Sequence, residues 1–282
     1  MKKIIVPTDF SETALNAVIY ARKLLKNDLC TFYILHAYQQ EIYESNSLIN
    51  EENLVEVTTA VQKKTQKNLE KLLKQINEFP KNAKHHYKIR SANNILVDEV
   101  DNIVDVKDID IVIMGTNGMT DDKKLTFGSN TIQVLKYIKC PVLIVPKEYK
   151  YKAPKKIVFS SNFYIPYQKR ELHFLSELAL NHKSKIDVLS FSDLKTISLR
   201  ELKNKHFIEA ILKNNNILFA TGDGKDIVKT IKSYIKKQDI DILVMINRRH
   251  SFLENILFKD TINTIGLTIK IPFLVLQNIK RD

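Results

Sequence analysis

The 282-residue chain carries 44 Lys and Arg against 32 Asp and Glu, which gives a formal net charge of +12. Hydrophobic residues make up 44% of the chain and charged residues 27%, which is typical of a folded globular protein and excludes an intrinsically disordered chain. No apolar run reaches the roughly 18 residues of a membrane span, and Met1 opens directly into an apolar strand without a signal-peptide layout, so we expect a cytoplasmic protein.

The first half of the chain alternates short β-rich runs with longer segments in which apolar residues recur at helical spacing. This alternation predicts a parallel sheet with crossover helices. The predicted strands are, in chain order, KKIIVPT, CTFYILHA, HHYKIR, DIVIMG and PVLIVPK. The predicted helices cover Ser11 to Lys26, about Glu51 to Glu78, about Asn94 to Val106, and Ser129 to Tyr137. Ser11 is placed to cap the first helix, because serine is a favoured N-cap residue.

The second half repeats the same order of elements. Its predicted strands are KKIVFSS, KIDVLSF, NILFAT, DILVMI and PFLVLQ. Its predicted helices run to about Asn181, from near Leu199 to Lys213, from near Asp226 to Lys237, and near Thr261. We therefore predict an α/β fold of two tandem, doubly wound domains, each with a five-stranded, Rossmann-like parallel sheet.

The predicted domains are residues 1–147 and 155–282, joined by a polar linker at 148–154. Ile4 corresponds to Ile157, whereas Asp108 corresponds to Asp239, so the first copy has 22 extra residues, around QQEIYESNSLINEENLVEV. The final strands PVLIVP and PFLVLQ are apolar and expected at sheet edges, which need a cover. We expect that cover from intrachain pairing of the two halves or from a homodimer.

Gly115, Gly118 and Gly128 are half of the chain's six glycines and follow the strand DIVIMG, with Ser129 directly after them. Without a Cβ, Gly115 and Gly118 can take positive φ and let the backbone approach a ligand closely. Gly128 and Ser129 stand where a helix begins, and a helix N-terminus suits phosphate. The hydroxyls of Ser129 and Thr131 can donate to phosphate oxygens. The alternative reading of the spacing is a flexible loop closed by an ordinary glycine before a helix.

Asp9 follows the first predicted strand, in IIVPTDFS, at the same edge of the sheet. A carboxylate there can accept hydrogen bonds from a ribose hydroxyl or an adenine amine. It can equally cap the first helix, because aspartate is a favoured cap like Ser11. Its counterpart in the second half is Asn162, which keeps the capping ability and loses the charge.

Other signatures point away from further chemistry. No Gly-x-Gly-x-x-Gly fingerprint follows the first strand, and TGDGKDI at 221–227 is too short for a Walker A loop, which favours a simple strand-to-helix turn. Cys30 and Cys140 are expected in the core, and His36 lacks metal-ligand neighbours. The lysines are scattered along helices among Glu and Gln, as in QKKTQKNLEKLLKQ, which predicts solvated helix faces and disfavours nucleic-acid binding.

The stretches IIVPTDFSETA, ILHAY and MGTNGMTDDKKLTFGSNT together resemble the ATP-binding branch of the universal stress proteins. The signature of that branch is Gly-x2-Gly-x9-Gly followed by Ser or Thr, and residues 115–129 fit this spacing without a gap. The resemblance covers nearly the whole chain as two tandem copies. It implies a Rossmann-like fold similar to that of the adenine nucleotide α-hydrolases, and it implies nucleotide binding.

The resemblance also implies the members of the nucleotide site. They are Pro7, Thr8 and Asp9 around the adenosine, Ala37 at the adenine edge, Met114, Gly115, Asn117 and Gly118 along the ribose and first phosphates, and Gly128, Ser129, Asn130 and Thr131 at the outer phosphates. Asn130 departs from the family, which usually has an apolar residue there. The stretch SANN at 91–94 also departs, because the family usually has a glycine turn before the third helix.

The second copy has lost the glycine signature. Aligning Phe127 with Phe258 places Ile246, Arg249, Lys259 and Asp260 at the positions of Gly115, Gly118, Gly128 and Ser129. Side chains at these places obstruct close backbone approach, and Asp260 brings negative charge to a phosphate seat. We therefore expect one ATP site per chain, in the first domain, and a structural role for the second.

The function that the resemblance implies is a regulatory, stress-response module in which ATP occupancy alters the protein's shape or partners. The charge run Asp121 to Lys124, in the loop between the glycines, is expected to be solvated; the alternative is that a lysine reaches a phosphate and an aspartate binds a Mg²⁺ ion with the nucleotide. The two domains would pack on each other as two single-domain members do in a dimer. The alternative is a slow ATPase or an adenylate-transferring enzyme of the same superfamily, and the lack of an evident general base or nucleophile near the glycines disfavours it.

Overall fold

The computed structural model describes residues 1–44, 51–116, 127–161, 163–164, 166–191, 197–247 and 270–277. It divides into two compact units, and the division falls between Cys140 and Pro141. The α/β class and the mainly parallel strand pairing predicted from the sequence are confirmed.

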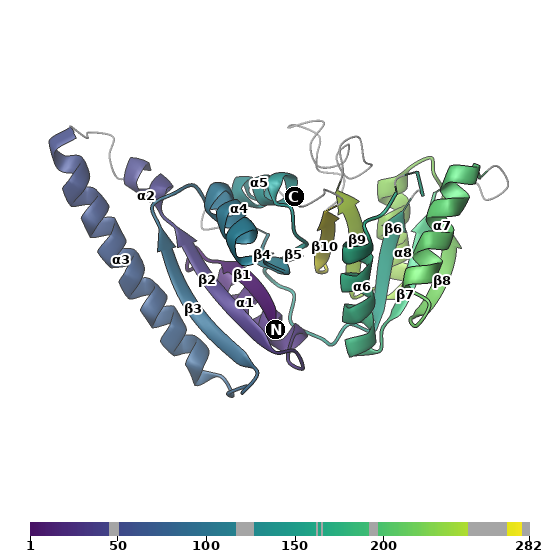
Figure 1. The fold of residues 1–282 in the computed structure, drawn as a ribbon, viewed down its shortest axis with the longest axis horizontal. Helices are drawn as coiled ribbons and strands as arrows, with labels where there is room; N and C mark the ends of the chain where they lie inside the picture. Colours follow the sequence, from purple (N-terminus) through teal and green to yellow (C-terminus); the bar gives the residue numbers. More distant parts are fainter. Residues whose placement is uncertain are drawn as a thin grey trace. The chain divides into compact units, whose positions relative to one another are not determined.

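The described strands of the first unit are parallel and lie in the order β3-β2-β1-β4. Its elements are β1 Lys2–Pro7, α1 Glu12–Leu24, β2 Cys30–Ala37, α2 Gln39–Glu44, α3 Glu51–Glu78, β3 His85–Ala92, α4 Leu96–Lys107, β4 Ile111–Gly115 and α5 Ser129–Tyr137. Helix α1 lies on one face of this sheet, and α4 and α5 lie on the other (Figure 1). The sheet is therefore covered on both sides, as the doubly wound fold requires.

Helix α1 forms where the sequence predicts it. The backbone N–H of Ala14 donates to Ser11 Oγ at 3.2 Å, which confirms Ser11 as the N-cap. The face of α1 that packs on the sheet is rich in small residues, including Ala14, Ala17 and Ala21. Such side chains let the helix lie close to the strands beneath it.

The 22 extra residues of the first copy lie in α2 and in the length of α3. Helix α3 has 28 residues, and its counterpart α7, Leu199–Ile211, has 13. The short helix α2 was not predicted. Among the described residues, no helix is both long enough and apolar enough to cross a membrane.

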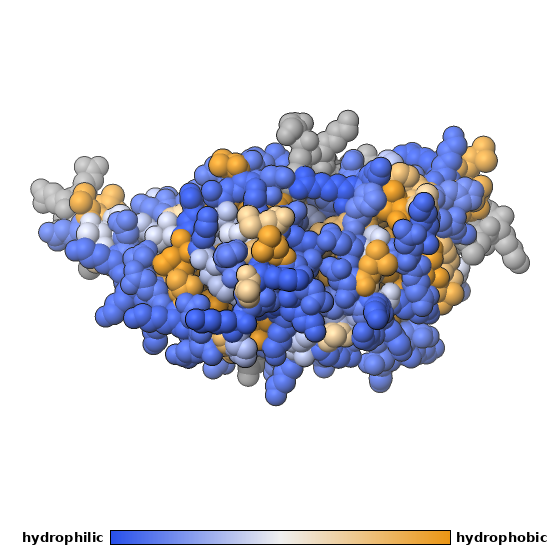
Figure 2. Space-filling model, turned by 60° about the horizontal axis from the view of Figure 1, so that its bottom comes forward, coloured by the Kyte–Doolittle hydropathy of each residue, from blue (hydrophilic) through white to orange (hydrophobic). Residues whose placement is uncertain are grey.

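The lysines of α3 behave as the sequence predicts. Leu69, Leu72 and Ile76 are buried on one face of the helix, whereas Lys67 and Lys71 on the other face are exposed. The surface drawn in Figure 2 is accordingly mostly hydrophilic, with separate small hydrophobic patches. Helix α3 is thus an amphipathic helix whose lysine-bearing face is solvated.

The second unit has a sheet in the order β5-β10-β9-β6-β7-β8. Its elements are β5 Val142–Val145, β6 Lys156–Ser161, α6 Lys169–His182, β7 Lys185–Ser190, α7 Leu199–Ile211, β8 Asn216–Thr221, α8 Ile227–Gln238, β9 Ile242–Asn247 and β10 Phe273–Gln277 (Figure 1). All neighbouring strands are parallel except β5 and β10. The helix predicted near Thr261 lies outside the described residues.

Strand β5 is grouped with the second unit, although the sequence predicts it in the first domain. It pairs with β10 in antiparallel register, with Leu143 opposite Leu274, and is therefore grouped with the second unit. The two apolar final strands thus cover each other's edges, as intrachain pairing predicts. The linker predicted at residues 148–154 stays a prediction, and the two compact units divide seven residues before it.

The internal repeat extends to the turns after the first strand of each copy. Phe10 and Phe163 both adopt positive φ, at 64° and 59°. The N–H of Phe10 donates to Thr8 Oγ1 at 3.0 Å, and the N–H of Phe163 donates to Ser161 Oγ at 3.1 Å. Positive φ is unusual for phenylalanine, so the same conformation at matched places marks a turn that both copies share.

A second matched pair ties the strands to the loops before β4 and β9. The backbone N–H of Lys3 donates to Asp110 Oδ2 at 2.8 Å, and that of Lys156 donates to Asp241 Oδ2 at 2.9 Å. Each aspartate belongs to one of the two DIDI stretches. The repeat recognised from the sequence is therefore a repeat of individual hydrogen bonds.

Candidate functional site

The predicted site residues gather at the carboxyl ends of β1, β2 and β4. Strand β1 is central, with Pro7 paired to Leu35 of β2, and Ile5 paired to Val112 of β4. The chain passes from β1 to β2 on one side, while β4 lies on the other side, so strand order reverses at the β1–β4 pair. Parallel α/β sheets bind ligands at such a switch point.

The turn after β1 shapes the polar part of the site. Asp9 Oδ1 accepts hydrogen bonds from the N–H and the hydroxyl of Ser11, at 3.1 and 2.6 Å. Ser11, and not Asp9, is the residue that caps α1. Asp9 therefore orients the cap residue, and among the described residues its other oxygen, Oδ2, has no hydrogen-bond partner.

Gly115 is required for a reason that differs from the prediction. No described glycine has positive φ, so the positive φ expected for Gly115 is wrong, and Gly118 lies outside the described residues. A Cβ built on Gly115 would lie 2.5 Å from Thr13 Cγ2 and 3.2 Å from the Thr13 carbonyl oxygen. Glycine at the end of β4 therefore lets the first turn of α1 pack directly on the strand.

Helix α5 begins beside the end of β4. Gly128 is its N-cap, with extended backbone at φ −67° and no side-chain cap. The N–H of Gly128 donates to the Thr116 carbonyl at 2.9 Å, which holds this turn against the strand. The side chains of Ser129 and Asn130 are exposed. A helix start without a side-chain cap leaves backbone N–H groups directed outward.

The hydroxyl of Thr131 donates to the backbone, whereas the sequence predicts that it donates to a phosphate. Its hydroxyl donates to the carbonyl oxygens of Thr116 and Gly115, at 3.0 and 3.3 Å, and its side chain is buried. That hydroxyl proton is already committed to the backbone. Thr131 thus fastens α5 to β4 and positions the helix end instead of offering a hydroxyl to a ligand.

His36 is a part of the site that the sequence did not reveal. Its Nδ1 lies 2.6 Å from the Thr8 carbonyl and its Nε2 lies 2.6 Å from Glu41 Oε1, in α2. The ring is buried and lies against Phe10, with the ring centroids 4.6 Å apart. A backbone carbonyl can only accept, so Nδ1 is the donor to Thr8. A histidine at a strand end with a glutamate five residues later is the only sequence signal of this link.

Some predicted members lie outside the described residues. These are Asn117 and Gly118 of the glycine loop, and Arg249, Lys259 and Asp260 of the second copy. Among the residues that the structure describes, no group of three or more His, Cys, Asp or Glu is placed to hold a metal ion. Burial raises the pKa of the Cys30 thiol to about 12, which suits the core position expected for it.

The matching place in the second unit has a side chain where the first unit has Gly115. Strand pairing aligns Ile111 with Ile242, which puts Ile246 where Gly115 lies in the first unit. Phe163 is completely buried, and its carbonyl accepts a hydrogen bond from Asn204 Nδ2, in α7, at 2.6 Å. The end of β6 is therefore covered by α7.

The model of the universal stress protein family matches residues 1–146. The chain belongs to the universal stress protein family. Strand order, the turn after β1 and the glycine-containing β4–α5 connection described above are thus features of a family member.

Two proteins of Methanocaldococcus jannaschii are similar in sequence. Universal stress protein MJ0531 is 28% identical over 146 residues, covering 52% of this chain and 82% of that protein. Universal stress protein MJ0577 is 29% identical over 160 residues, covering 52% of this chain and 96% of that protein. Similarity thus extends over about half of this chain and most of each relative.

A universal stress protein structure from Archaeoglobus fulgidus is similar over both copies. It has a TM-score of 0.69 and 15% sequence identity, covering 98% of this chain and 96% of that one. At this identity the likeness concerns the fold alone. It places the whole chain, and not only its first half, in this architecture.

Proposed function

We propose that the first unit binds ATP at the carboxyl ends of β1 and β4, and that occupancy of this site regulates the protein in a stress response. The proposal rests chiefly on the start of α5, which lacks a side-chain cap and is held against β4 by Gly128 and Thr131. The positive end of a helix dipole and outward N–H groups attract phosphate. Family membership and the glycine spacing support the same reading.

In this proposal the nucleotide spans the switch point. The adenosine lies by the Thr8–Asp9 turn and Ala37, where Asp9 Oδ2 is available to accept from a ribose hydroxyl or the adenine amine. The phosphates lie at Gly128 and Ser129, where the backbone supplies the donors. Asn117 and Gly118 would complete the phosphate contacts, with Mg²⁺ as a counterion if the loop carboxylates take part.

The nearby titratable side chains favour binding over chemistry. Asp9 accepts from Ser11, and His36 is held between Thr8 and Glu41. Both groups shape the turn that would contact the adenosine. We therefore propose a binding module, and a regulatory change of shape or partner follows from nucleotide occupancy.

One ATP per chain is the expected stoichiometry. Ile246 and the buried Phe163 occupy the second unit where the first has Gly115 and the half-buried Phe10. Isothermal titration of the full chain with ATP should therefore give about one site. Two sites of equal affinity, or no binding, would contradict the proposal.

Gly128→Asp is expected to weaken ATP binding at least about tenfold while leaving the fold intact. Aspartate suits the N-cap backbone of Gly128, but its charge would repel a phosphate at the start of α5. Gly128→Asn is the matched control, because asparagine caps equally well, has nearly the same shape and is neutral. Both variants are titrated with ATP and melted by circular dichroism. Equal ATP affinities for the two variants would place the phosphates elsewhere.

A further inference from the structure

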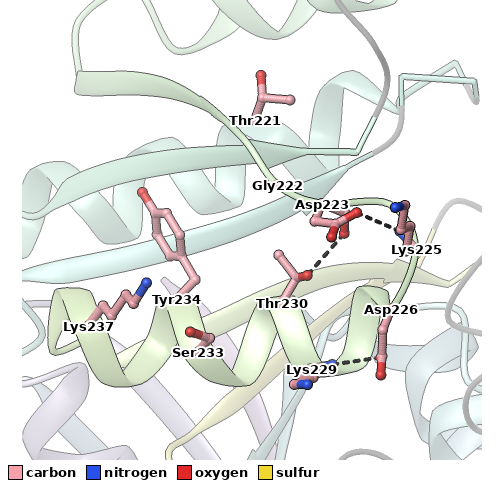
Figure 3. Close-up of a pocket in the computed structure, with 10 residues that line it drawn as sticks. All are labelled: Thr221, Gly222, Asp223, Lys225, Asp226, Lys229, Thr230, Ser233, Tyr234 and Lys237. Carbon is pink, nitrogen blue, oxygen red and sulfur yellow. Dashed lines mark hydrogen bonds between the residues drawn. The ribbon is translucent and has the colours of Figure 1, made fainter.

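The second unit contains a pocket at the turn between β8 and α8. It has a volume of about 540 Å³, within the range of small-molecule sites. Its lining residues are Thr221, Gly222, Asp223, Lys225, Asp226, Lys229, Thr230, Ser233, Tyr234 and Lys237 (Figure 3). It involves only the second unit, and none of its residues belongs to the ATP site proposed above.

Cations and hydroxyl groups dominate this lining. Lys225 lies in the turn, and Lys229 and Lys237 lie on α8. Tyr234 and Lys237 rise from the same side of α8 toward β8 (Figure 3). Residues 229 and 237 are eight apart, so their Cα atoms are separated by about 12 Å along the helix axis.

The two carboxylates of the pocket are already used by the backbone. Asp223 Oδ1 accepts from the N–H of Lys225 at 2.9 Å, and Asp226 Oδ1 accepts from the N–H of Lys229 at 2.9 Å. Asp226 is the N-cap of α8. The helix end is therefore occupied by this carboxylate, and an anion would be held by the lysine side chains along the helix.

The same helix has the opposite charge in the first unit. Helices α4 and α8 are both 12 residues long and occupy corresponding places in the two copies. Helix α4 reads LVDEVDNIVDVK, with four carboxylates and one lysine, whereas α8 reads IVKTIKSYIKKQ, with four lysines and no carboxylate. In this register Asp98, Asp101 and Asp105 correspond to Lys229, Lys232 and Lys236, and Lys229 is the member of this set that lines the pocket.

The second unit lacks an ion pair that joins the corresponding strand and helix of the first unit. In the first unit, Arg90 on β3 contacts Glu99 on α4, with Nε 2.7 Å from Oε1, and Glu99 is buried there. Strand and helix register put Ala220 and Thr230 at these places in the second unit. Two long side chains are thus replaced by two short ones, of which Thr230 lines the pocket.

We propose that this pocket binds a small ligand with two or more phosphate groups. Lysines spread along α8 fit an extended polyanion better than a single phosphate, and the hydroxyls of Ser233 and Thr221 add neutral donors. The shared chemistry is a phosphate chain, carried by inorganic polyphosphate or by a nucleotide. A nucleotide would in addition present a base to Tyr234.

The test is titration of the full chain with inorganic tripolyphosphate at about 0.15 M salt, where diffuse surface attraction is screened. The variant Lys225→Gln/Lys229→Gln/Lys237→Gln should bind at least about tenfold more weakly than the native chain. The matched control is Lys213→Gln/Lys232→Gln/Lys236→Gln, which removes the same charge from exposed lysines outside the pocket. The control should change affinity less than about threefold. Thermal melting of both variants checks the fold.

Three outcomes decide the proposal. Equal losses in the two triple variants, or no binding of tripolyphosphate, would overturn it. Both variants are also titrated with duplex DNA. If the pocket variant loses DNA binding and keeps its tripolyphosphate affinity, the lysines form a nucleic-acid surface and the proposal is overturned. Repeating the titrations in a Gly128→Asp background separates phosphate binding at this pocket from phosphate binding at the first unit. Parallel titration with ATP shows whether the phosphate chain or the base carries the affinity.

Discussion

Gly115→Ala is expected to lower the free energy of unfolding by about 2 to 3 kcal/mol, because it overpacks a rigid contact. The new Cβ would lie 2.5 Å from Thr13 Cγ2 and 3.2 Å from the Thr13 backbone oxygen, so α1 must move away from β4. Urea unfolding followed by circular dichroism measures the change.

Thr13→Ser provides the test of this cause. It removes Cγ2, the atom nearest to the added Cβ, and leaves the backbone oxygen in place. The double variant Thr13→Ser/Gly115→Ala should regain about 1 kcal/mol relative to the sum of the single changes. Strict additivity, or a Gly115→Ala protein as stable as the native chain, would show that this packing is not what requires glycine.

Asp241→Asn is expected to lower the free energy of unfolding by about 3 kcal/mol, because hydrogen bonds to a buried charge are lost. Asp241 is 5% exposed, and its carboxylate accepts from the N–H groups of Lys155 and Lys156 and pairs with Lys152 at 2.6 Å. An asparagine amide has one acceptor oxygen, so its NH2 group would face either Lys152 or the two backbone N–H groups. The loss would free the 148–154 segment, predicted only as a linker, from the second unit.

Asp239→Asn is the matched control. Asp239 belongs to the same DIDI stretch, but it is exposed. Its carboxylate lies 3.7 Å from Lys152 Nζ, farther than the 2.6 Å that separates Asp241 from Lys152. Asparagine also tolerates its left-handed backbone at φ 52°. This variant should change stability by less than about 0.5 kcal/mol. A similar loss in both variants would point to general charge removal instead of the buried contacts.

The contribution of Asp241 should depend on pH. Burial by itself raises the pKa of this carboxyl, but the bonds from Lys152 and from the N–H groups of Lys155 and Lys156 outweigh burial and lower the pKa. A group with a lowered folded pKa stabilises fully above its unfolded pKa of about 3.9 and loses that contribution as pH falls through the folded value. The stability difference between the native chain and Asp241→Asn should therefore shrink below about pH 4. A difference independent of pH would contradict this account.

Many elements of the fold could be predicted because the information is local. Helix α5 begins at Ser129 and ends at Tyr137, and α3 spans Glu51 to Glu78, as the sequence predicts. Ser11 caps α1 for the same reason, since a serine hydroxyl reaches the N–H three residues ahead. The repeat was also recognisable, because two copies of one pattern appear in a single chain.

The site could be predicted only in part. Its residues were placed at one edge of the sheet because parallel strands end together, and the described members lie at the ends of β1, β2 and β4 and at the start of α5. The glycine at 115 was recognised, but its packing partner Thr13 was not, because that contact joins segments about a hundred residues apart. The link from His36 to Glu41 and the pocket lined by Thr230 and Tyr234 likewise depend on which side chains face each other.

The sequence by itself determined the α/β class, the tandem repeat, the family resemblance and the loss of glycines from the second copy. These follow from periodicity, spacing and comparison along one chain. Only the tertiary structure decided that β5 pairs with β10, that Gly115 serves helix packing, and that a turn expected to be inert lines a basic pocket. Each of these depends on non-local contacts, in which strand pairing and side-chain volume outweigh what neighbouring residues prescribe.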